Sequence, residues 1–325
     1  ALLSHFSVMI KDKSQIFPSG PTVVERAIGE KLSKEELGGW RMHVVESGQV
    51  DNVAENEDDA FQQIRDFLSY LPNTVRDVAP RVDTGDDPER RPQELLDFVP
   101  TNRRQGYDAR ALIRHVVDNG DFFEMRELYA SGLITGFARL DGWSVGVICS
   151  DPMSKAGAMD GNAADKYTHF LDLCDTFNLP LLIFLDMPGF MLGSHAERIA
   201  TMRRGARALI ASAECQVPKV EFMVRKSYGV AADAPNSIGL PDSINLRFGW
   251  PSGECGGIPI EGGVAAAYRR EIADADDPDA HREAIEERLL RLRSPFRAAH
   301  RGDAVSYTHI RAPETEADLG CRGLR

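Results

Sequence analysis

Apolar and polar segments alternate along the middle of the chain in a way that predicts strands and helices following one another. Apolar runs at 179–185 and 217–224 are typical of buried strands, and 196–213 between them has helical spacing. Upstream, 134–140 and 143–148 flank an Asp-Gly pair, which predicts a β-hairpin. Because strand and helix alternate, we expect right-handed crossovers and a largely parallel sheet, which makes the fold class α/β.

Residues that favour helix ends predict further helices on either side of this region. Pro21, with the capping-box spacing of Thr22 and Glu25, predicts a helix start, and Ser33 with Glu36 repeats that signal. Apolar spacing predicts additional helices at 58–71, 160–177, 262–272 and 278–292. The apolar residues of the first of these include Phe61, Ile64 and Phe67.

The same patterns divide the chain into two domains and a tail. Residues 83–104 are rich in Asp, Arg and Pro and lack an apolar period, so we read them as an exposed connection. The first domain with this linker then covers 1–100, and the second covers 101–300. Residues 301–325 have neither a helical nor a strand period. We favour a non-native tail there, and a natural disordered terminus is the alternative.

Composition excludes several classes of protein and site. Among 325 residues, 50 acidic and 38 basic side chains give a net charge of −12, which disfavours nucleic acid or an anionic membrane as the main partner. The five cysteines form no C-x-x-C pair, so neither a zinc ribbon nor a disulfide framework is indicated, and we expect no metal. No apolar run is long enough for a membrane span, and the first six residues lack the basic region and apolar core that are typical of a signal peptide. A cytoplasmic protein without direct membrane insertion is expected.

A turn of small residues follows each of the two buried strands. The first strand breaks at Asp186-Met187-Pro188-Gly189-Phe190, and the second leads into Arg225-Lys226-Ser227-Tyr228-Gly229-Val230-Ala231-Ala232-Asp233. Beyond the carboxyl ends of parallel strands lies the crevice where ligands bind, and bare N–H groups there suit an oxygen that becomes negative. These turns predict an active site that needs no catalytic side chain, and we expect none of His43, His115, His169 or His195 to act as a base.

The two turns, about forty residues apart, resemble motifs of the carboxyltransferase (β) subunit of biotin-dependent acyl-CoA carboxylases, the family of propionyl-, acetyl- and methylcrotonyl-CoA carboxylases. The resemblance runs from about residue 5 to about residue 300. It implies a crotonase-like superhelix of ββα units, with the biotin-binding second domain nearly complete and the acyl-CoA-binding first domain truncated. Further matches are Glu35-Glu36-Leu37-Gly38-Gly39, Phe67-Leu68-Ser69-Tyr70-Leu71-Pro72, Met202-Arg203-Arg204-Gly205-Ala206 and Trp250-Pro251.

The resemblance also implies roles for particular residues. The N–H groups of Val230 and Ala231, after Gly229, would form the oxyanion hole on the biotin side. Val230 replaces a glycine of the family pattern Tyr-Gly-Gly-Ala, which we expect to narrow the approach and to forbid a positive φ. Asp233 would shape the preference for the acyl chain, and Pro259 stands where the family commonly has glycine. The residues expected to bind the biotin cofactor are Pro188, Gly189 and Phe190.

The implied reaction moves a carboxyl group from carboxybiotin to the α carbon of a short acyl-CoA. The cofactor supplies the base, and the protein supplies positioning and two oxyanion holes. Implied partners are a biotin carboxylase and biotin carboxyl carrier subunit, and further copies of the chain in a dimer-based hexamer. Two alternatives stay open: a biotin-dependent decarboxylase of a carboxyacyl-CoA, and a non-catalytic assembly subunit with the same fold.

The segment resembling the family starts after the glycine-rich loop that would hold the CoA thioester, and the chain begins without Met. We therefore expect a fragment that is inactive alone. We also expect it to expose apolar surface at Phe61, Ile64 and Phe67 and to associate through it.

Overall fold

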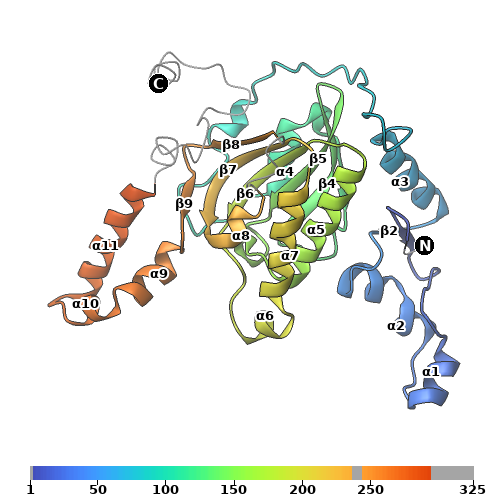
Figure 1. Cartoon of the computed structure of the whole chain (residues 1–325), viewed down its shortest axis with the longest axis horizontal. Coiled ribbons are helices and arrows are strands. Elements are labelled where there is room, and N and C mark those ends of the chain that lie inside the picture. Colours follow the sequence, from blue (N-terminus) through green and yellow to red (C-terminus); the bar gives the residue numbers. More distant parts are fainter. Residues whose placement is uncertain (1–2, 236–243, 294–325) are drawn as a thin grey trace.

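The structure is a computed structural model that describes residues 3–235 and 244–293 (Figure 1). Its centre is a seven-stranded sheet in the order β3-β4-β5-β6-β7-β8, with β9 also paired to β7. The strands β5 to β8 run parallel, whereas β3, β4 and β5 are antiparallel. These strands are β3 (Phe122–Met125), β4 (Leu133–Leu140), β5 (Trp143–Ser150), β6 (Leu181–Met187), β7 (Lys219–Tyr228), β8 (Asn245–Gly249) and β9 (Glu254–Gly256).

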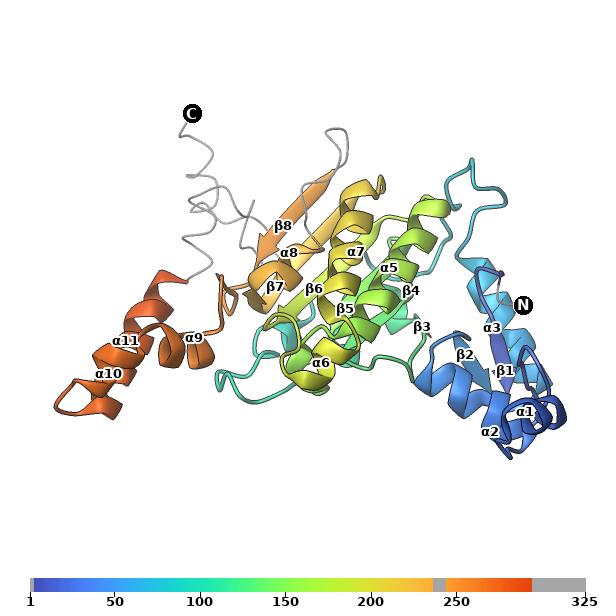
Figure 2. The same ribbon diagram turned by 60° about the horizontal axis from the view of Figure 1, so that its bottom comes forward.

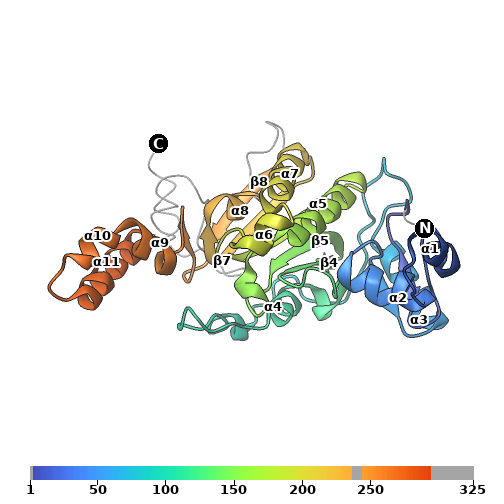
Figure 3. The ribbon, with the colours of Figure 1, turned by 90° about the horizontal axis from the view of Figure 1, so that it is seen from below.

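Helices cover both faces of this sheet. The helices α5 (Gly161–Thr176) and α7 (Thr201–Glu214) lie side by side on one face (Figure 2), where Phe170 and Ala208 are fully buried. The helix α4 (Ala109–Val116) covers the other face (Figure 3). Each face therefore has its own apolar core, which explains why β6 reads as a continuous apolar run rather than as an alternating one.

Two smaller bodies project from opposite ends of the central sheet (Figures 1 and 3). The N-terminal body pairs β1 (Val8–Ile10) with β2 (Asn52–Ala54) in parallel. Its helical segments are α1 (Pro21–Ile28), α2 (Lys34–Gly38), the π-helical turn Arg41–Glu46 and α3 (Glu57–Ser69). The C-terminal arm consists of α9 (Ile260–Ala267), α10 (Arg269–Ala273) and α11 (Pro278–Leu292), packed around a small core of their own. The short helices α6 (Ser194–Arg198) and α8 (Gly229–Asp233) complete the sheet domain, along with single 3₁₀ turns.

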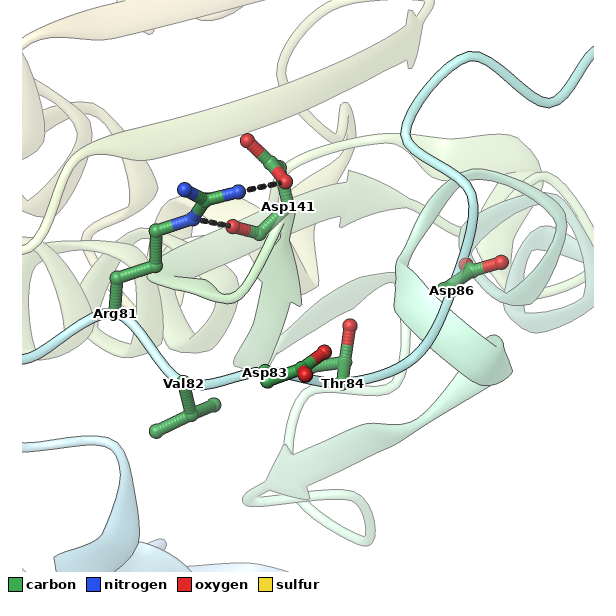
Figure 4. A pocket seen from close by; sticks show the side chains of 6 residues that line it. All are labelled: Arg81, Val82, Asp83, Thr84, Asp86 and Asp141. Carbon is green, nitrogen blue, oxygen red and sulfur yellow. Dashed lines mark hydrogen bonds and ion pairs between the residues drawn. The ribbon is translucent and has the colours of Figure 1, made fainter.

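The predicted hairpin is confirmed as β4 and β5. Asp141 and Gly142 take the left-handed φ values of 51° and 77° that its two-residue turn requires. The buried Asp118 carboxylate accepts the N–H groups of both turn residues, at 3.0 and 2.7 Å, and Arg81 bonds the backbone and side chain of Asp141 (Figure 4). The pocket beside this turn therefore lies at the start of β5, away from the carboxyl ends of the parallel strands.

Several helix ends agree with the sequence and others do not. The capping box of Ser33 and Glu36 is present at α2. The one expected for Thr22 and Glu25 was wrong, because Gly20 is the N-cap of α1 and no side chain caps that helix. The predicted helix 278–292 is confirmed as α11.

Three predicted segments have different limits in the structure. The helix 196–213 is two helices, α6 and α7, separated where Ala200 takes a φ of 54°. The helix 262–272 is likewise divided, into α9 and α10. The strand 217–224 continues as β7 to Tyr228, because Arg225 and Lys226 find partners within the sheet.

The expected apolar exposure on α3 is confirmed for two of its three residues. Phe61 is 56% exposed and Ile64 is 37% exposed. The prediction was wrong for Phe67, which is 5% exposed because its ring stacks on Phe6 and packs against Phe137. The contacts of Phe67 therefore join the N-terminal body to the core of the sheet domain.

Within the described residues, no helix is long and apolar enough to cross a membrane. In the same part of the chain, no group of three or more His, Cys, Asp or Glu side chains is arranged to hold a metal ion. The predicted tail, 301–325, lies outside the described residues, and the division of the chain at residue 100 stays a prediction.

Candidate functional site

The two predicted turns lie side by side at the carboxyl ends of β6 and β7. The strands are parallel, and Met187 pairs with Ser227 at their ends. A Cβ placed on Gly189 would lie 3.5 Å from the carbonyl oxygen of Tyr228, so the first turn touches the second. The structure thus brings together two segments that the sequence separates by about forty residues, at the sheet edge where α/β proteins bind ligands.

A buried ion pair fixes the two strand ends relative to each other. The register between β6 and β7 shifts between Leu185 and Met187, which leaves Asp186 without a paired residue. Its carboxylate accepts bonds from Arg225 Nε and Nη2 at 3.0 and 2.9 Å, and from the N–H of Lys226 at 3.1 Å. The side chains of Asp186 and Arg225 are only 1% and 4% exposed. The Asp186 carboxylate therefore accepts the Lys226 N–H in place of a backbone carbonyl of the neighbouring strand.

The aromatic ring of Tyr107 covers this ion pair. The Arg225 guanidinium lies 5.2 Å from the ring centre, and its Nη1 donates to the Gln105 carbonyl at 2.8 Å. Burial and the nearby Asp186 charge raise the pKa of Tyr107 well above its ordinary value. The phenol thus stays neutral, and the ion pair is enclosed from this side.

The second turn is a glycine followed by a short helix. Gly229 has a φ of 65°, and a Cβ there would also lie 3.2 Å from the Gly257 carbonyl oxygen. From Gly229 the chain turns into α8, so the N–H groups of Val230 and Ala231 belong to the first turn of a helix and have no partner inside it. The left-handed conformation falls on Gly229 rather than on Val230, whose side chain is 56% exposed. Valine is therefore compatible with the backbone of this position.

The first turn contains a glycine with an unusual backbone and a ring packed beneath it. Gly189 has a φ of 125°, a region open to few residues other than glycine. Phe190 packs against the main core, and a Cβ placed on Gly205 of α7 would lie 2.3 Å from its Cζ. The close approach explains the glycine in the Arg203-Arg204-Gly205-Ala206 motif, and it shows that Phe190 holds the turn onto α7.

The connection from β5 to α5 adds a third segment that the sequence reasoning missed. Met159 forms a bridge with Phe190, donating to the Gly189 carbonyl at 3.1 Å and accepting from Met191 at 2.9 Å. Gly157, with a φ of 77°, approaches the Asp186 carbonyl so closely that a Cβ would lie 2.3 Å from it. Its position in the sequence could have indicated this segment, because the connection also follows the carboxyl end of a parallel strand, where ligands bind.

On the far side of the second turn, Tyr228 is anchored to β9. Its hydroxyl donates to Glu254 at 2.7 Å, and Arg103 pairs with the same carboxylate oxygen at 2.5 Å. Burial and the Glu254 carboxylate raise the pKa of Tyr228, so the hydroxyl keeps its proton and remains a donor. A pocket of about 400 Å³ opens here, lined in part by Arg103, Arg225 and Glu254.

The remaining predicted residues take up different places. Asp233 ends α8 and is exposed. Pro259 is the N-cap of α9, where a residue without an N–H is tolerated. His43 contacts the Ile16 carbonyl at 2.7 Å in the N-terminal body, and His115, which lies in α4, packs edge-on against Phe98. These contacts indicate a structural role for both histidines.

Comparisons with known proteins agree with this arrangement. A family model described as the carboxyl transferase domain matches residues 1–322. The chain is 40% identical over 301 residues to the propionyl-CoA carboxylase, carboxyltransferase subunit, of Haloferax mediterranei, covering 92% of this chain and 58% of that protein. It is 39% identical over 300 residues to the methylmalonyl-CoA decarboxylase subunit alpha of Veillonella parvula, covering 92% of this chain and 57% of that protein.

A solved structure of transcarboxylase 12S, with methylmalonyl-coenzyme A and methylmalonic acid bound, has a TM-score of 0.88 and 35% identity. It aligns with 99% of this chain, which covers 60% of that one, and it confirms the crotonase-like α/β fold class. The chain thus spans less than two thirds of the length of these relatives. By the extent of the family match and by its fold, the chain belongs to the carboxyl transferase domain family of biotin-dependent acyl-CoA carboxylases.

Proposed function

We propose that the protein containing this chain transfers a carboxyl group between biotin and the α carbon of a short acyl-CoA, using the N–H groups of Val230 and Ala231 as an oxyanion hole. The observation that carries the proposal is the pair of turns at one sheet edge. The two N–H groups have no partner within α8, and they follow Tyr228, whose carbonyl oxygen would lie 3.5 Å from a Cβ placed on Gly189. Preorganised N–H groups of this kind stabilise an oxygen on which negative charge develops.

The residues present fit a ligand of the chemistry that biotin offers. Gly189 and Gly229 have φ values of 125° and 65° and no side chain, so at both turns the backbone itself can contact a small planar group. Carboxybiotin, when bound, would supply both the carboxyl group and the base. Pro188 and Gly189 would form the wall of this site, and Phe190 would fix that wall through its packing on Gly205.

A carboxyacyl-CoA decarboxylase is the second candidate. The identity to a decarboxylase subunit, 39%, is nearly the same as the 40% to a carboxylase subunit, so sequence similarity favours neither direction. Carboxylation and decarboxylation would both use the same proposed oxyanion hole. The third possibility, an assembly subunit that has lost the hole, is less favoured because Val230 adopts helical backbone and keeps its N–H.

The proline variant Val230→Pro in the complete subunit tests the hole. Proline removes one N–H but suits the first turn of a helix, so α8 should still form. Loss of one oxyanion donor lowers kcat by on the order of a hundredfold or more. The control is Val230→Ala, which shortens the same side chain and keeps the donor. Equal turnover in the two folded variants would contradict the proposal.

Asp233 is proposed to influence the choice of acyl chain. Because it is exposed at the end of α8, Asp233→Ile should alter the surface next to the proposed hole. We expect the ratio of kcat/KM for acetyl-CoA and propionyl-CoA to change, while the dependence on biotin stays as it was. Asp279→Ile, at an exposed position on α11, is the control. An unchanged ratio would assign Asp233 a structural role.

Partners follow from the same proposal. A biotin carboxylase and a biotin carrier subunit would deliver the carboxyl group to the turns at β6 and β7. Transcarboxylase 12S is described as a hexamer, and we propose a dimer-based hexamer for the complete protein here, in the cytoplasm. Sedimentation of the complete protein, alone and with a biotinylated carrier, would measure both associations.

A further inference from the structure

The helix that carries the proposed oxyanion donors is too short to hold itself in place. The five residues of α8 allow one hydrogen bond between residues four apart, so the helix depends on contacts with its surroundings. Ala231 and Ala232 are each 1% exposed, so their methyl groups pack against the core. Apolar packing is not directional, whereas a hydrogen bond fixes the direction of the group that it joins. The position of the donors therefore depends on what bonds the rest of α8.

A buried ion pair lies behind α8, between β7 and β8. Glu221 and Arg247 are directly paired in the parallel register, and Arg247 Nε lies 2.5 Å from Glu221 Oε1. Their side chains are 1% and 13% exposed. Burial raises the pKa of Glu221, and the positive charge of Arg247 opposes that rise. Lys219, on the same strand, instead donates to the hydroxyl and carbonyl of Ser212.

Arg247 extends from this pair to α8. Its Nη2 donates to the carbonyl oxygen of Ala232 at 3.2 Å, within the last turn of the helix. Carbonyls there have no helical partner, and a cation at a helix C-terminus is favourable. One guanidinium thus joins β7, β8 and α8. An arginine can do this because its planar fork presents several donors in fixed directions.

We propose that Arg247, held in place by Glu221, is a positioning residue that sets the orientation of the Val230 and Ala231 N–H groups by bonding the Ala232 carbonyl. This inference rests on the proposed function, since it assigns Arg247 an effect on the reaction through those donors. Arg247 acts from behind the helix and has no contact with substrate in this role.

The test compares Arg247→Met with Arg247→Lys. Methionine keeps most of the length and removes both bonds. Lysine keeps the charge, but its single ammonium group replaces a rigid fork and serves one partner well at a time. Glu221→Gln/Arg247→Met, which also removes the buried carboxylate, guards against loss of folding caused by an unpaired charge.

Arg126→Met is a matched control, because Arg126 forms a similarly buried ion pair with Asp51, with side chains 12% and 3% exposed, at the N-terminal body. Two measurements are made on each variant: hydrogen exchange of the peptide covering 229–235, and kcat and KM of the complete subunit. Exchange reports the helix directly and does not require any bound cofactor.

We expect hydrogen exchange at 229–235 to become about tenfold faster or more in Arg247→Met, because a hydrogen bond to a charged group is lost. The exchange rate of Arg247→Lys should lie between those of Arg247→Met and the wild type. In the same order, kcat should fall while KM is unchanged, and the control should show neither effect. Wild-type exchange at 229–235 in folded Arg247→Met and in the double variant would overturn the inference, whatever the activity. Faster exchange with unchanged kcat would overturn the catalytic role of this contact.

Val230→Pro separates this inference from the proposed function. If that variant keeps full turnover, the hole itself is wrongly assigned. If it loses turnover while Arg247→Met retains both turnover and protection, only the positioning role fails.

Discussion

Removing the Asp186 carboxylate should destabilise the sheet domain more than removing any exposed carboxylate of the chain. In Asp186→Ala, the Arg225 guanidinium loses two charge-assisted bonds, of 3.0 and 2.9 Å, and the Lys226 N–H loses its acceptor. Bonds to charged groups contribute about 1.5–3 kcal/mol each. Breaking one side of a buried pair costs about 3–5 kcal/mol overall, because an uncompensated charge remains. We therefore expect a loss of about 4 kcal/mol in the free energy of unfolding.

Urea unfolding followed by tryptophan fluorescence and by circular dichroism would measure this loss. Trp250 is a suitable probe, because it is 4% exposed and its backbone N–H donates to the Met223 carbonyl of β7 at 3.0 Å. The matched control is Glu55→Ala, since Glu55 pairs with Lys11 at the surface and is 67% exposed. Exposed pairs contribute up to about 1 kcal/mol.

A double variant separates the effect of charge from that of shape. Asp186→Leu/Arg225→Met removes both charges and fills a similar volume, so it should be more stable than Asp186→Ala. It should stay less stable than the wild type because the Lys226 N–H still lacks its acceptor. If Asp186→Ala lost no more stability than Glu55→Ala, the ion pair would not be what fixes the two strand ends, and the reasoning would be refuted.

The helix α5 gives two further predictions, one from Lys166 within it and one from Asp160 at its N-cap. Burial lowers the pKa of Lys166 to about 7, although its Nζ donates to the carbonyls of Arg126 and Tyr129 at 2.8 and 2.9 Å. Because the unfolded chain keeps this proton up to about pH 10, the contribution of Lys166 should make the free energy of unfolding rise between about pH 7 and 10, and Lys166→Met should flatten that rise in urea titrations. Asp160 caps α5 by accepting the N–H of Ala163 at 2.8 Å, so Asp160→Ala should cost about 1–2 kcal/mol in the same assay, with Asp160→Asn closer to the wild type. A loss in Asp160→Asn as large as in Asp160→Ala would argue against capping as the cause.

Elements whose signals are local could be predicted from the sequence. The hairpin of β4 and β5 is specified by an Asp-Gly turn between two apolar runs, and both turn residues have the backbone that this turn needs. The helix α11 begins after Asp277, whose side chain accepts the N–H of Ala280, and Pro278 suits its first turn. In each case the residues that decide the structure are neighbours along the chain.

Elements that depend on distant partners could not be predicted as well. The apolar run predicts that this strand ends at Val224, but β7 continues to Tyr228, because Arg225 and Lys226 bond Asp186 on another strand. The division between α6 and α7 follows from the left-handed Ala200, for which the sequence has no glycine signal.

For the candidate site, the two turns were found from the sequence, because strand ends and glycines identify them. Their mutual contact and the third segment at Met159 required the structure. The roles of Arg247 and Glu221 also depend on pairing between strands that the sequence does not display.

The pairing of β7 has a consequence for aggregation. This ten-residue strand meets β6 on one side, and on the other side β8 pairs with its first half and β9 with its last three residues. In the described part of the chain, the outermost strands of the sheet are therefore short: β3 has four residues, β8 has five and β9 has three. Unpaired strand edges are templates for pairing with other molecules, and short edges limit that process. Among the described strands, β5 and β6 have partners on both sides, so these two apolar strands present no edge at which pairing between chains could begin.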